Sequence, residues 1–292
     1  MEVNLASKNL ETFPLDVLEK TNIKVLNLST YTGHWDTWVD PNIFEEIPEQ
    51  IEKLKNLQVL NLSRTCIKKL PSSFQNLKEL KHLDLSSTLI TSFPNEILNL
   101  PNLETLNLSY CNIPTIPDEI CNLKNLKHLE MWGCSVNKIP KSIGQLKKLE
   151  TLNLYNNKLS EIPPAIKGLE NLKTIMMGNM EENRNQISAI PPEIGQLRNL
   201  QKIHLGNNKL NSLPIELKQC KSLKELTLWS NQFTEIPEWL SEMKLEDLNF
   251  FQNQIKHLPS NNKWLKQINK LTLDFHLDKE MESTNSKWKF WK

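Results

Sequence analysis

One stretch of the chain decides its fold: Leu57-x-x-Leu60-x-Leu62-x-x-Thr65-x-Ile67-x-x-Leu70-Pro71-x-x-Phe74-x-x-Leu77. The same order of residues returns 23 positions later, from Leu80 to Pro94. Eleven of the sixteen prolines hold one place in this unit, at spacings of 23 except for single steps of 34, 28 and 22. They are Pro14, Pro48, Pro71, Pro94, Pro117, Pro140, Pro163, Pro191, Pro214, Pro237 and Pro259. Chance placement cannot give this spacing, so the chain is built from repeats.

Each repeat is expected to contain one short strand. Leu60 and Leu62 alternate with polar neighbours, as in a strand with one buried face. The first apolar residue of the strand recurs twelve times, at Val3, Leu26, Leu60, Leu83, Leu106, Leu129, Leu152, Ile175, Ile203, Leu226, Leu248 and Leu271. Stacked repeats bury a continuous core that no single strand can bury alone. The proline fixes φ and removes a donor, so we expect it to start a return limb with short helical or 3₁₀ turns on the convex side.

This pattern resembles the leucine-rich repeat, whose signature is L-x-x-L-x-L-x-x-N-x-L. The 23-residue form with Leu/Ile-Pro-x-x-Ile is similar to the class found in plant Ras-group-related repeat proteins, animal scaffolds and many bacterial repeat proteins. The resemblance covers residues 1 to about 276. It implies an α/β solenoid, a curved horseshoe with a parallel β-sheet on its concave face. It also implies roles in scaffolding, signalling or host contact, without naming a ligand.

The resemblance gives a structural role to the asparagine of the signature, which in the family bonds to the backbone of adjacent coils. Here that position holds Asn42, Asn157, Asn185, Asn208, Asn231 and Asn253. It is replaced by Thr65, Thr88, Cys111 and Cys134 in the N-terminal half, and by Lys8 and His276 at the ends. Thr and Cys still offer smaller donors. We therefore expect this column to be structural.

Two insertions interrupt the rhythm at the same point of the repeat, just after the strand. They occupy residues 29–41, before Asn42, and residues 178–184, before Asn185. Insertions in repeat proteins map to loops on one face, often the binding face. Trp35 and Trp38 in the first loop either fold back to shield the end coils or form a flap that contacts a ligand.

The repeat stops after Leu273, which divides the chain into a repeat domain, residues 1–276, and a C-terminal segment, residues 277–292. A solenoid needs a cap over its last apolar face. The segment is either that cap, through Trp288, Phe290 and Trp291, or a flexible basic-aromatic tail over Lys287–Lys292. Such a tail is too short to bind lipid or nucleic acid strongly.

Composition excludes several classes of function. The chain has 292 residues, 48 of them Leu, and 35 Lys and Arg against 34 Asp and Glu give a formal net charge of +1. A nucleic-acid reader usually carries a clear basic excess, so we expect none here. No apolar run is long enough to span a membrane, and no secretion signal is visible. Five cysteines, an odd number, favour reduced thiols. We expect a cytoplasmic protein, or a secreted one if a signal was removed.

No arrangement of residues indicates catalysis. The seven glycines form no phosphate loop, and neither Cys-x-x-Cys nor His-Glu-x-x-His occurs. Cys111 and Cys134 occupy neighbouring coils, but two thiols without further ligands make a poor zinc site. His82 and His128 lie two coils apart, roughly 10 Å at a strand spacing of about 4.8 Å, which is too far to share a metal. We expect no catalytic residue, metal or cofactor.

The outward-facing residues of the strands predict a binding surface. Their third position carries Ser in the N-terminal half and then Trp132, Tyr155, Trp229 and Phe251, with Gly178 and Gly206 between them. Trp and Tyr often carry the binding energy of an interface, and the glycines are expected to leave a shallow trough between the rings. The predicted partner-binding residues are Trp132, Tyr155, Trp229, Phe251, Tyr110, Met176, His204 and His128. Alternatively, the rings cover neighbouring coils or pair with a second copy of the chain.

The sequence therefore predicts a monomeric, non-catalytic protein–protein interaction module with a preorganised concave binding face. The alternative is the recognition fragment of a larger multidomain effector, signalling protein or enzyme. An enzyme in its own right would need a convergent acid–base or metal cluster on one face. A structural or adhesive role would predict self-association through the N-terminal edge, where the first strand starts at Val3 with almost no cap.

Overall fold

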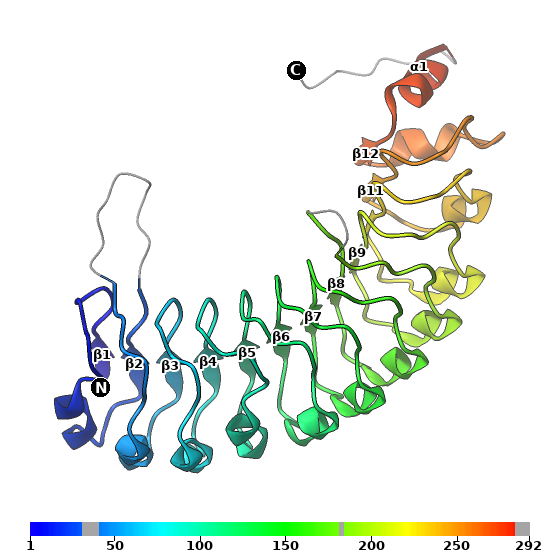
Figure 1. The fold of residues 1–292 in the computed structure, drawn as a ribbon. Helices are drawn as coiled ribbons and strands as arrows, with labels where there is room; N and C mark the ends of the chain where they lie inside the picture. The colour runs from blue at the N-terminus through cyan, green and yellow to red at the C-terminus, as the bar shows by residue number, and fades with distance from the viewer. Residues whose placement is uncertain (31–40, 181–183, 284–292) are drawn as a thin grey trace.

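Each repeat folds as one coil of a curved solenoid. The computed structural model describes residues 1–30, 41–180 and 184–283. Within these residues, twelve strands form one parallel sheet in chain order. Figure 1 shows the strands toward the inner side of the arc and the short 3₁₀ turns along its outer side. The predicted α/β solenoid is thereby confirmed.

The strands fall where the repeat places them. They are β1 (Glu2–Asn4), β2 (Val25–Asn27), β3 (Val59–Asn61), β4 (His82–Asp84), β5 (Thr105–Asn107), β6 (His128–Glu130), β7 (Thr151–Asn153), β8 (Thr174–Met176), β9 (Lys202–His204), β10 (Glu225–Thr227), β11 (Asp247–Asn249) and β12 (Lys270–Thr272). Equivalent residues pair directly, so that Leu60 faces Leu83 and Leu83 faces Leu106. Each outward position therefore forms a column that crosses the sheet.

A 3₁₀ turn forms the outer limb of each coil. The turns are η1 (Leu15–Glu19), η2 (Glu49–Lys53), η3 (Ser72–Asn76), η4 (Asn95–Asn99), η5 (Asp118–Asn122), η6 (Lys141–Gln145), η7 (Pro164–Gly168), η8 (Pro192–Gln196), η9 (Ile215–Gln219), η10 (Glu238–Glu242) and η11 (Lys263–Gln267). The repeat proline precedes η1 to η10, with φ of −71° at Pro71 and −67° at Pro140, for example. Asn262 precedes η11 instead. The ring of proline sets this φ in advance, which favours the start of the turn.

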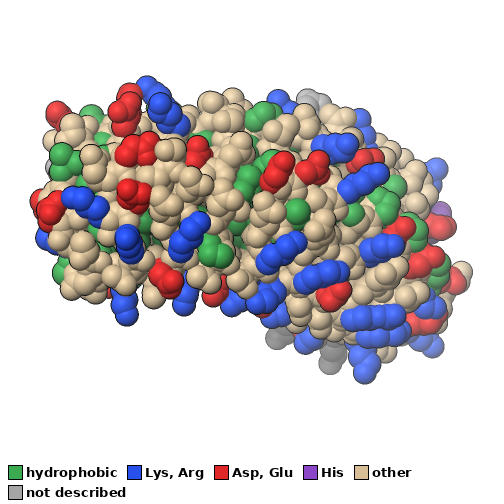
Figure 2. Space-filling view, turned by 90° about the horizontal axis from the view of Figure 1, so that it is seen from below, with side chains coloured by type: hydrophobic (Ala, Val, Ile, Leu, Met, Phe, Trp, Pro, Cys, Tyr) green, Lys and Arg blue, Asp and Glu red, His purple; other side chains and the backbone are tan. Residues whose placement is uncertain are grey.

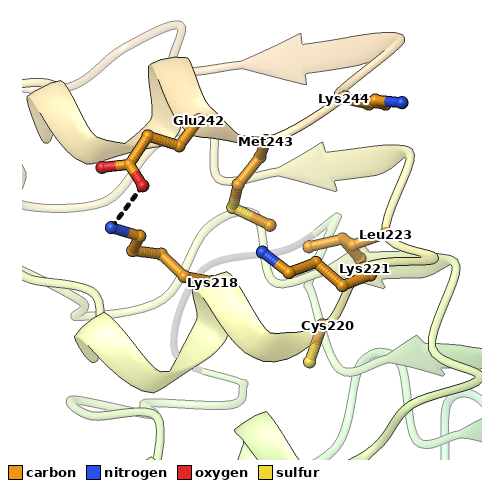
Figure 3. Close-up of a pocket in the computed structure, with 7 residues that line it drawn as sticks. All are labelled: Lys218, Cys220, Lys221, Leu223, Glu242, Met243 and Lys244. Carbon is orange, nitrogen blue, oxygen red and sulfur yellow. Dashed lines mark ion pairs between the residues drawn. The ribbon is translucent and has the colours of Figure 1, made fainter.

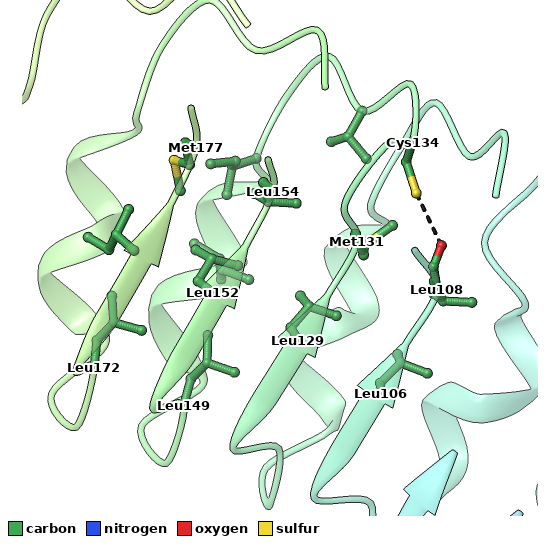
Figure 4. Packing of buried hydrophobic residues seen from close by; sticks show 14 of the residues in the cluster. Leu106, Leu108, Leu129, Met131, Cys134, Leu149, Leu152, Leu154, Leu172 and Met177 are labelled. Atoms are coloured by element: carbon green, nitrogen blue, oxygen red, sulfur yellow. Dashed lines mark hydrogen bonds between the residues drawn. The ribbon is translucent and has the colours of Figure 1, made fainter. Parts of the chain in front are cut away.

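One apolar core runs through all the coils. Leu106, Leu129 and Leu152 stack in successive strands and are 0% exposed (Figure 4). Anchors from the outer turns, such as Phe74 and Ile143, reach the same core and are also fully buried. Burial of one such side chain contributes roughly 1.5–3 kcal/mol. The stability of each coil therefore depends on contacts with its two neighbours.

The asparagine column ties each coil to the one before it. Asn157 Nδ2 donates to Met131 O of the preceding coil at 2.8 Å, and Asn157 Oδ1 accepts from Val136 N at 2.9 Å. Asn208 makes the equivalent bonds to the coil before it, with Nδ2 donating to Met177 O at 3.0 Å. Buried amides bonded in this way hold irregular backbone in place. The expected structural role of this column agrees with these contacts.

The residues that replace asparagine make fewer such bonds. Thr65 Oγ1 donates to Leu62 O within its own coil at 2.7 Å. Cys134 Sγ donates to Leu108 O of the preceding coil at 3.1 Å (Figure 4). All five cysteines lie within the described residues and are free thiols: Cys66, Cys111, Cys121, Cys134 and Cys220. At this position of the repeat, the coils with Thr65, Thr88, Cys111 and Cys134 therefore make fewer side-chain bonds to neighbouring coils than those with asparagine.

A helix, α1 (Phe275–Ser283), follows the last coil. Leu277 and Met281 are 0% and 4% exposed and belong to the continuous core. His276 Nε2 lies 2.9 Å from Ile255 O. The predicted division after residue 276 falls inside this helix. The aromatic residues of the predicted tail, Trp288, Phe290 and Trp291, lie outside the described residues.

Ion pairs join neighbouring coils, and Figure 2 shows Lys and Arg interspersed with Asp and Glu over one face of the solenoid. The residue before each strand alternates in sign from Glu104 through Lys127 and Glu150 to Lys173. Lys127 Nζ lies 2.7 Å from Glu104 Oε2, and Lys173 Nζ lies 2.7 Å from Glu150 Oε2. A hydrogen bond from each lysine lowers the pKa of its glutamate. The sequence analysis missed this column, although its sign alternates at the repeat spacing.

Candidate partner-binding surface

Of the predicted site residues that the structure describes, all but Tyr110 stand on the outward columns of the sheet, and Tyr110 lies one position beyond the third column. Leu129 and Met131 are 0% exposed, whereas Glu130 and Trp132, which alternate with them, are partly exposed. Trp132 lies two residues beyond the end of β6 and therefore shares the outward direction of Glu130. The common register then brings the third-column residues of the neighbouring coils to the same side.

Three rings on successive coils form a continuous group, which we call the aromatic ladder: Tyr110, Trp132 and Tyr155. The ring centroids of Tyr110 and Trp132 are 5.0 Å apart at an interplanar angle of 47°. Those of Trp132 and Tyr155 are 6.0 Å apart at 88°, an edge-to-face contact. Such contacts fix the rings relative to one another. Trp132 Nε1 is buried and has no hydrogen-bond partner among the described residues.

Tyr110 is held in an unusual backbone conformation. Its φ is 58°, in the left-handed region, and 53% of its surface is exposed. The equivalent residues of other coils share this conformation, with φ of 58° at Arg64, 56° at Ser87, 53° at Asn156 and 67° at Gly133. A residue other than glycine is disfavoured there by roughly 1–2 kcal/mol. Among the described residues with positive φ, Tyr110 is the one that carries an aromatic ring.

The trough expected between the aromatic residues is filled. A Cβ at Gly178 would lie 2.8 Å from Tyr155 Cε2, and one at Gly206 would overlap the indole of Trp229. Both glycines are buried. The ring of Tyr155 therefore lies over Gly178 of the next coil, and the ring of Trp229 lies over Gly206 of the preceding coil. The expectation of an open trough was wrong because these rings occupy the space that glycine leaves.

Trp229 and Phe251 lie apart from the ladder. Two coils, containing β8 and β9, separate Tyr155 from Trp229. Trp229 is half-buried over Gly206, while Phe251 is 40% exposed. The structure therefore brings together three of the five predicted aromatic residues and places the other two on the same column further toward the C-terminus.

The asparagines of the second outward column have a local role that the sequence analysis missed. Asn107 Oδ1 accepts from Ser109 N at 3.0 Å, and Asn153 Oδ1 accepts from Tyr155 N at 3.1 Å. Asn61 makes the same bond to the residue two positions ahead. These asparagines turn the chain at the end of each strand. Their oxygens are engaged within the protein, so they are less adaptable for binding than their residue type suggests.

Glu130 breaks this second column. In β1 to β7 the equivalent position is otherwise Asn or Asp. The backbone N of Trp132 donates to Ser109 Oγ at 3.2 Å instead of to Glu130. Glu130 Oε2 accepts from Asn153 Nδ2 at 2.6 Å. Burial raises the pKa of Glu130, although the bond from Asn153 opposes this. Sequence reasoning could have found Glu130 as the one departure from this column in the first seven coils.

The predicted polar contacts at His128 and His204 are engaged within the sheet. His128 Nδ1 lies 3.2 Å from Thr151 Oγ1. His204 Nε2 lies 3.7 Å from Glu225 Oε2, and Lys202 Nζ lies 2.6 Å from Glu225 Oε1. Burial lowers the pKa of His204, an effect that Glu225 opposes. Met176 is half-buried on β8.

A separate hollow of about 260 Å³ lies between η9 and η10 (Figure 3). Its lining consists of Lys218, Cys220, Lys221, Leu223, Glu242, Met243 and Lys244. Lys218 Nζ pairs with Glu242 Oε2 at 2.6 Å. Cys220 Sγ donates to Ile194 O at 3.2 Å, and burial raises its pKa to about 11. The hollow therefore presents a protonated thiol and a paired lysine rather than an activated nucleophile.

Other chemistry finds no support in the part of the chain that the structure describes. No three His, Cys, Asp or Glu side chains there come together as metal ligands. No helix of the described residues is long and apolar enough to cross a membrane. The predicted loop contacts, Trp35 and Trp38, lie outside the described residues.

Family models of one kind match most of the repeat region. The model described as "Leucine-rich repeat region" matches residues 38–111 and 118–185. "Leucine Rich repeats (2 copies)" matches residues 198–242, and "Leucine Rich Repeat" matches residues 102–123. No curated protein matches the chain significantly.

Solved structures share the fold over nearly the whole chain. The plant peptide hormone receptor RGFR1, in complex with RGF2, is 27% identical with a TM-score of 0.73, over 91% of this chain and 41% of the receptor chain. A leucine-rich repeat protein from Leptospira interrogans is 25% identical with a TM-score of 0.55, over 96% and 93% of the two chains. An internalin from Listeria monocytogenes, 20% identical with a TM-score of 0.68 over 94% and 82%, shares the fold. The repeat, the solenoid and these matches show that the chain belongs to the leucine-rich repeat proteins.

Proposed function

We propose that this leucine-rich repeat domain binds a protein partner on its concave face, without catalysis, and that the aromatic ladder is the centre of the contact. The fold is in general a protein-interaction module. The observation that carries the proposal is Tyr110, which keeps a half-exposed ring at a φ of 58°. A residue kept at a local energetic cost on a surface is a candidate for function.

The rigidity of the ladder supports this role. Trp132 is fixed between the rings of Tyr110 and Tyr155, and Tyr155 in turn lies over Gly178. Rings that are already ordered lose little conformational entropy when a partner binds. Trp229 over Gly206 and the exposed Phe251 extend the same column, so a partner of sufficient length contacts both groups.

A second candidate function is recognition within a larger protein. The chain spans 41% of the length of the RGFR1 chain, a receptor whose structure contains RGF2. Under this alternative the concave face still binds the partner, and a further domain of the larger protein carries out the signalling or catalytic activity. The five free thiols favour a cytoplasmic location for either candidate.

Capture of the partner from an extract of the source cells tests the proposal. The immobilised protein is compared with a variant that carries Trp132→Ala, Tyr155→Ala, Trp229→Ala and Phe251→Ala. A matched control replaces two exposed apolar residues of the outer turns, Leu15 and Ile215, with Ala. Retained proteins are quantified by mass spectrometry, and thermal unfolding is followed by circular dichroism.

We expect the protein and the control variant to retain the same partner and the four-residue variant to lose it, with similar unfolding transitions for all three. Retention of the partner by the folded four-residue variant would refute the concave contact. Light scattering of the unmodified protein checks the accompanying expectation that it is a monomer. A dimer that dissociates in the four-residue variant would instead assign the rings to self-association.

A further inference from the structure

The carboxylate of Glu130 occupies a place where the fold favours asparagine. Asn107 and Asn153 on the neighbouring strands accept a bond from the backbone two residues ahead. Glu130 does not, and Trp132 N takes its acceptor from Ser109 instead. Glutamate at this position therefore does not serve the turn, and its one hydrogen bond goes to Asn153 of the next coil. The reason for its presence lies outside the turn that it borders.

The charge of Glu130 is poorly compensated within the protein. Two carboxylates on the first outward column are paired, Glu225 with Lys202 at 2.6 Å and Asp247 with Lys270 at 2.9 Å. Glu130 has one hydrogen bond, from the neutral amide of Asn153, and no lysine or arginine within ion-pair distance among the described residues. His128, two residues earlier on β6, also lowers the pKa of Glu130, but the effect of burial is larger. A half-buried carboxylate with a single neutral partner is destabilising unless something else supplies positive charge. Its raised pKa agrees with this.

The middle ring of the aromatic ladder, Trp132, follows this carboxylate on the same strand. Trp132 is two residues beyond Glu130 on the same strand and the same face, and successive outward residues of a strand are about 7 Å apart. Tyr155 stands on the neighbouring coil, next to Trp132. An elongated cation that bonds a carboxylate with its head can at that distance lie against an aromatic ring. The carboxylate of Glu130 and the ring of Trp132 together suit a side chain with a charged end and an apolar stem.

We propose that Glu130 is the anchor for one arginine or lysine of the protein partner, whose side chain lies along Trp132 and forms an ion pair with the carboxylate. This inference rests on the concave face being the binding surface. A metal ion fits the position less well, because the only neighbour bonded to Glu130 offers an N–H group and not a ligand oxygen. A cationic side chain needs a single carboxylate and gains from the adjacent ring.

A displayed library of random dodecapeptides, selected on the intact protein, supplies ligands of known sequence. Each selected peptide is first titrated against the variant with Trp132→Ala and Tyr155→Ala, to identify those that need the ladder. These are then compared with versions in which each basic residue is replaced by Ala. Titrations use the unmodified protein, Glu130→Gln, and the control Asp84→Asn. Asp84 lies in the same column two coils away, where its carboxylate accepts from Ser86 N at 2.9 Å.

We expect ladder-dependent peptides to contain a basic residue whose loss weakens binding to the protein and to Asp84→Asn by about tenfold or more. In Glu130→Gln the same loss should change affinity by less than about threefold, because the ion pair is already gone. Ladder-dependent peptides without a basic residue, or with one that matters equally in Glu130→Gln, would overturn the anchor and leave the proposed function standing. If no peptide depends on the ladder, the anchor and the proposed concave contact both fail.

Discussion

Replacement of Asn157 by alanine should show how much one bond between coils contributes. The side chain is 0% exposed and links three backbone groups: Met131 O, Tyr155 O and Val136 N. Tyr155 O keeps a second donor, Gly133 N at 2.9 Å, after the change. Met131 O and Val136 N lose their bonds to Asn157. Two buried groups are therefore left without the partners seen in the structure.

Each buried polar group left unpaired costs about 1–3 kcal/mol. The two unpaired groups of Asn157→Ala should therefore lower the free energy of unfolding by roughly 2–6 kcal/mol, to which the small cavity left by alanine adds. The matched control is Asn125→Ala. Asn125 Nδ2 also donates to a carbonyl of the preceding coil, Pro101 O at 2.7 Å, but at an exposed site where water can replace it.

Urea denaturation followed by circular dichroism measures both variants. Hydrogen exchange of the Val136 amide then tests whether the loss is local, because coils of a repeat protein can open separately. We expect faster exchange at Val136 in Asn157→Ala only. A loss of stability in Asn157→Ala no larger than that in Asn125→Ala would refute the role given to the buried amide.

Three further outcomes follow from the same structure. Gly206→Ala should displace the indole of Trp229 and weaken partner capture, and because the site is buried it should lower the free energy of unfolding by about 1–3 kcal/mol in urea denaturation. Unaltered capture by the folded variant would show that the pose of Trp229 is unimportant. Because burial raises the folded-state pKa of Glu130 above its ordinary 4.5, its charge weakens the folded state at neutral pH and ceases to do so below that value. Glu130→Gln should then stabilise the protein at neutral pH but not in acid, and urea titrations that give an equal gain at both would contradict this. A thiol reagent should label only Cys66 and Cys121 quickly in the native protein, whereas mass spectrometry of the unfolded chain should also find label on the buried cysteines, Cys111, Cys134 and Cys220.

The repeat was sufficient to predict the solenoid because its signals are redundant. Every coil repeats the same leucines, and ten of the eleven described turns begin after the same proline. A strand that is hard to assign in one coil can be placed from its neighbours, because all strands share one register. The positions of Trp132 and Tyr155 on an outward column followed from the phase of that register alone.

Side-chain contacts between neighbouring columns could not be predicted from the repeat pattern. Period-two alternation gives the side of the sheet on which Tyr155 stands, but not that its ring leans over Gly178. It also cannot distinguish an asparagine that faces a partner from one that bonds its own turn, as Asn153 does. Both depend on side-chain torsions that differ from coil to coil. The sequence marks Glu130 as a departure from its column, but the hydrogen bonds on which its proposed role rests depend on the side-chain geometry of the neighbouring coils.

The shared register of the sheet also sets a scale for anything laid across it. Strands follow one another at about 4.8 Å, whereas an extended polypeptide advances about 3.3 Å with each residue. Three residues of such a segment then cover about the same 10 Å as two coils. Side chains three apart in a crossing segment would meet equivalent positions on alternate coils, such as those of Trp132 and Gly178. An extended partner segment that repeats a residue type at every third position would therefore place that residue against the same column on every second coil.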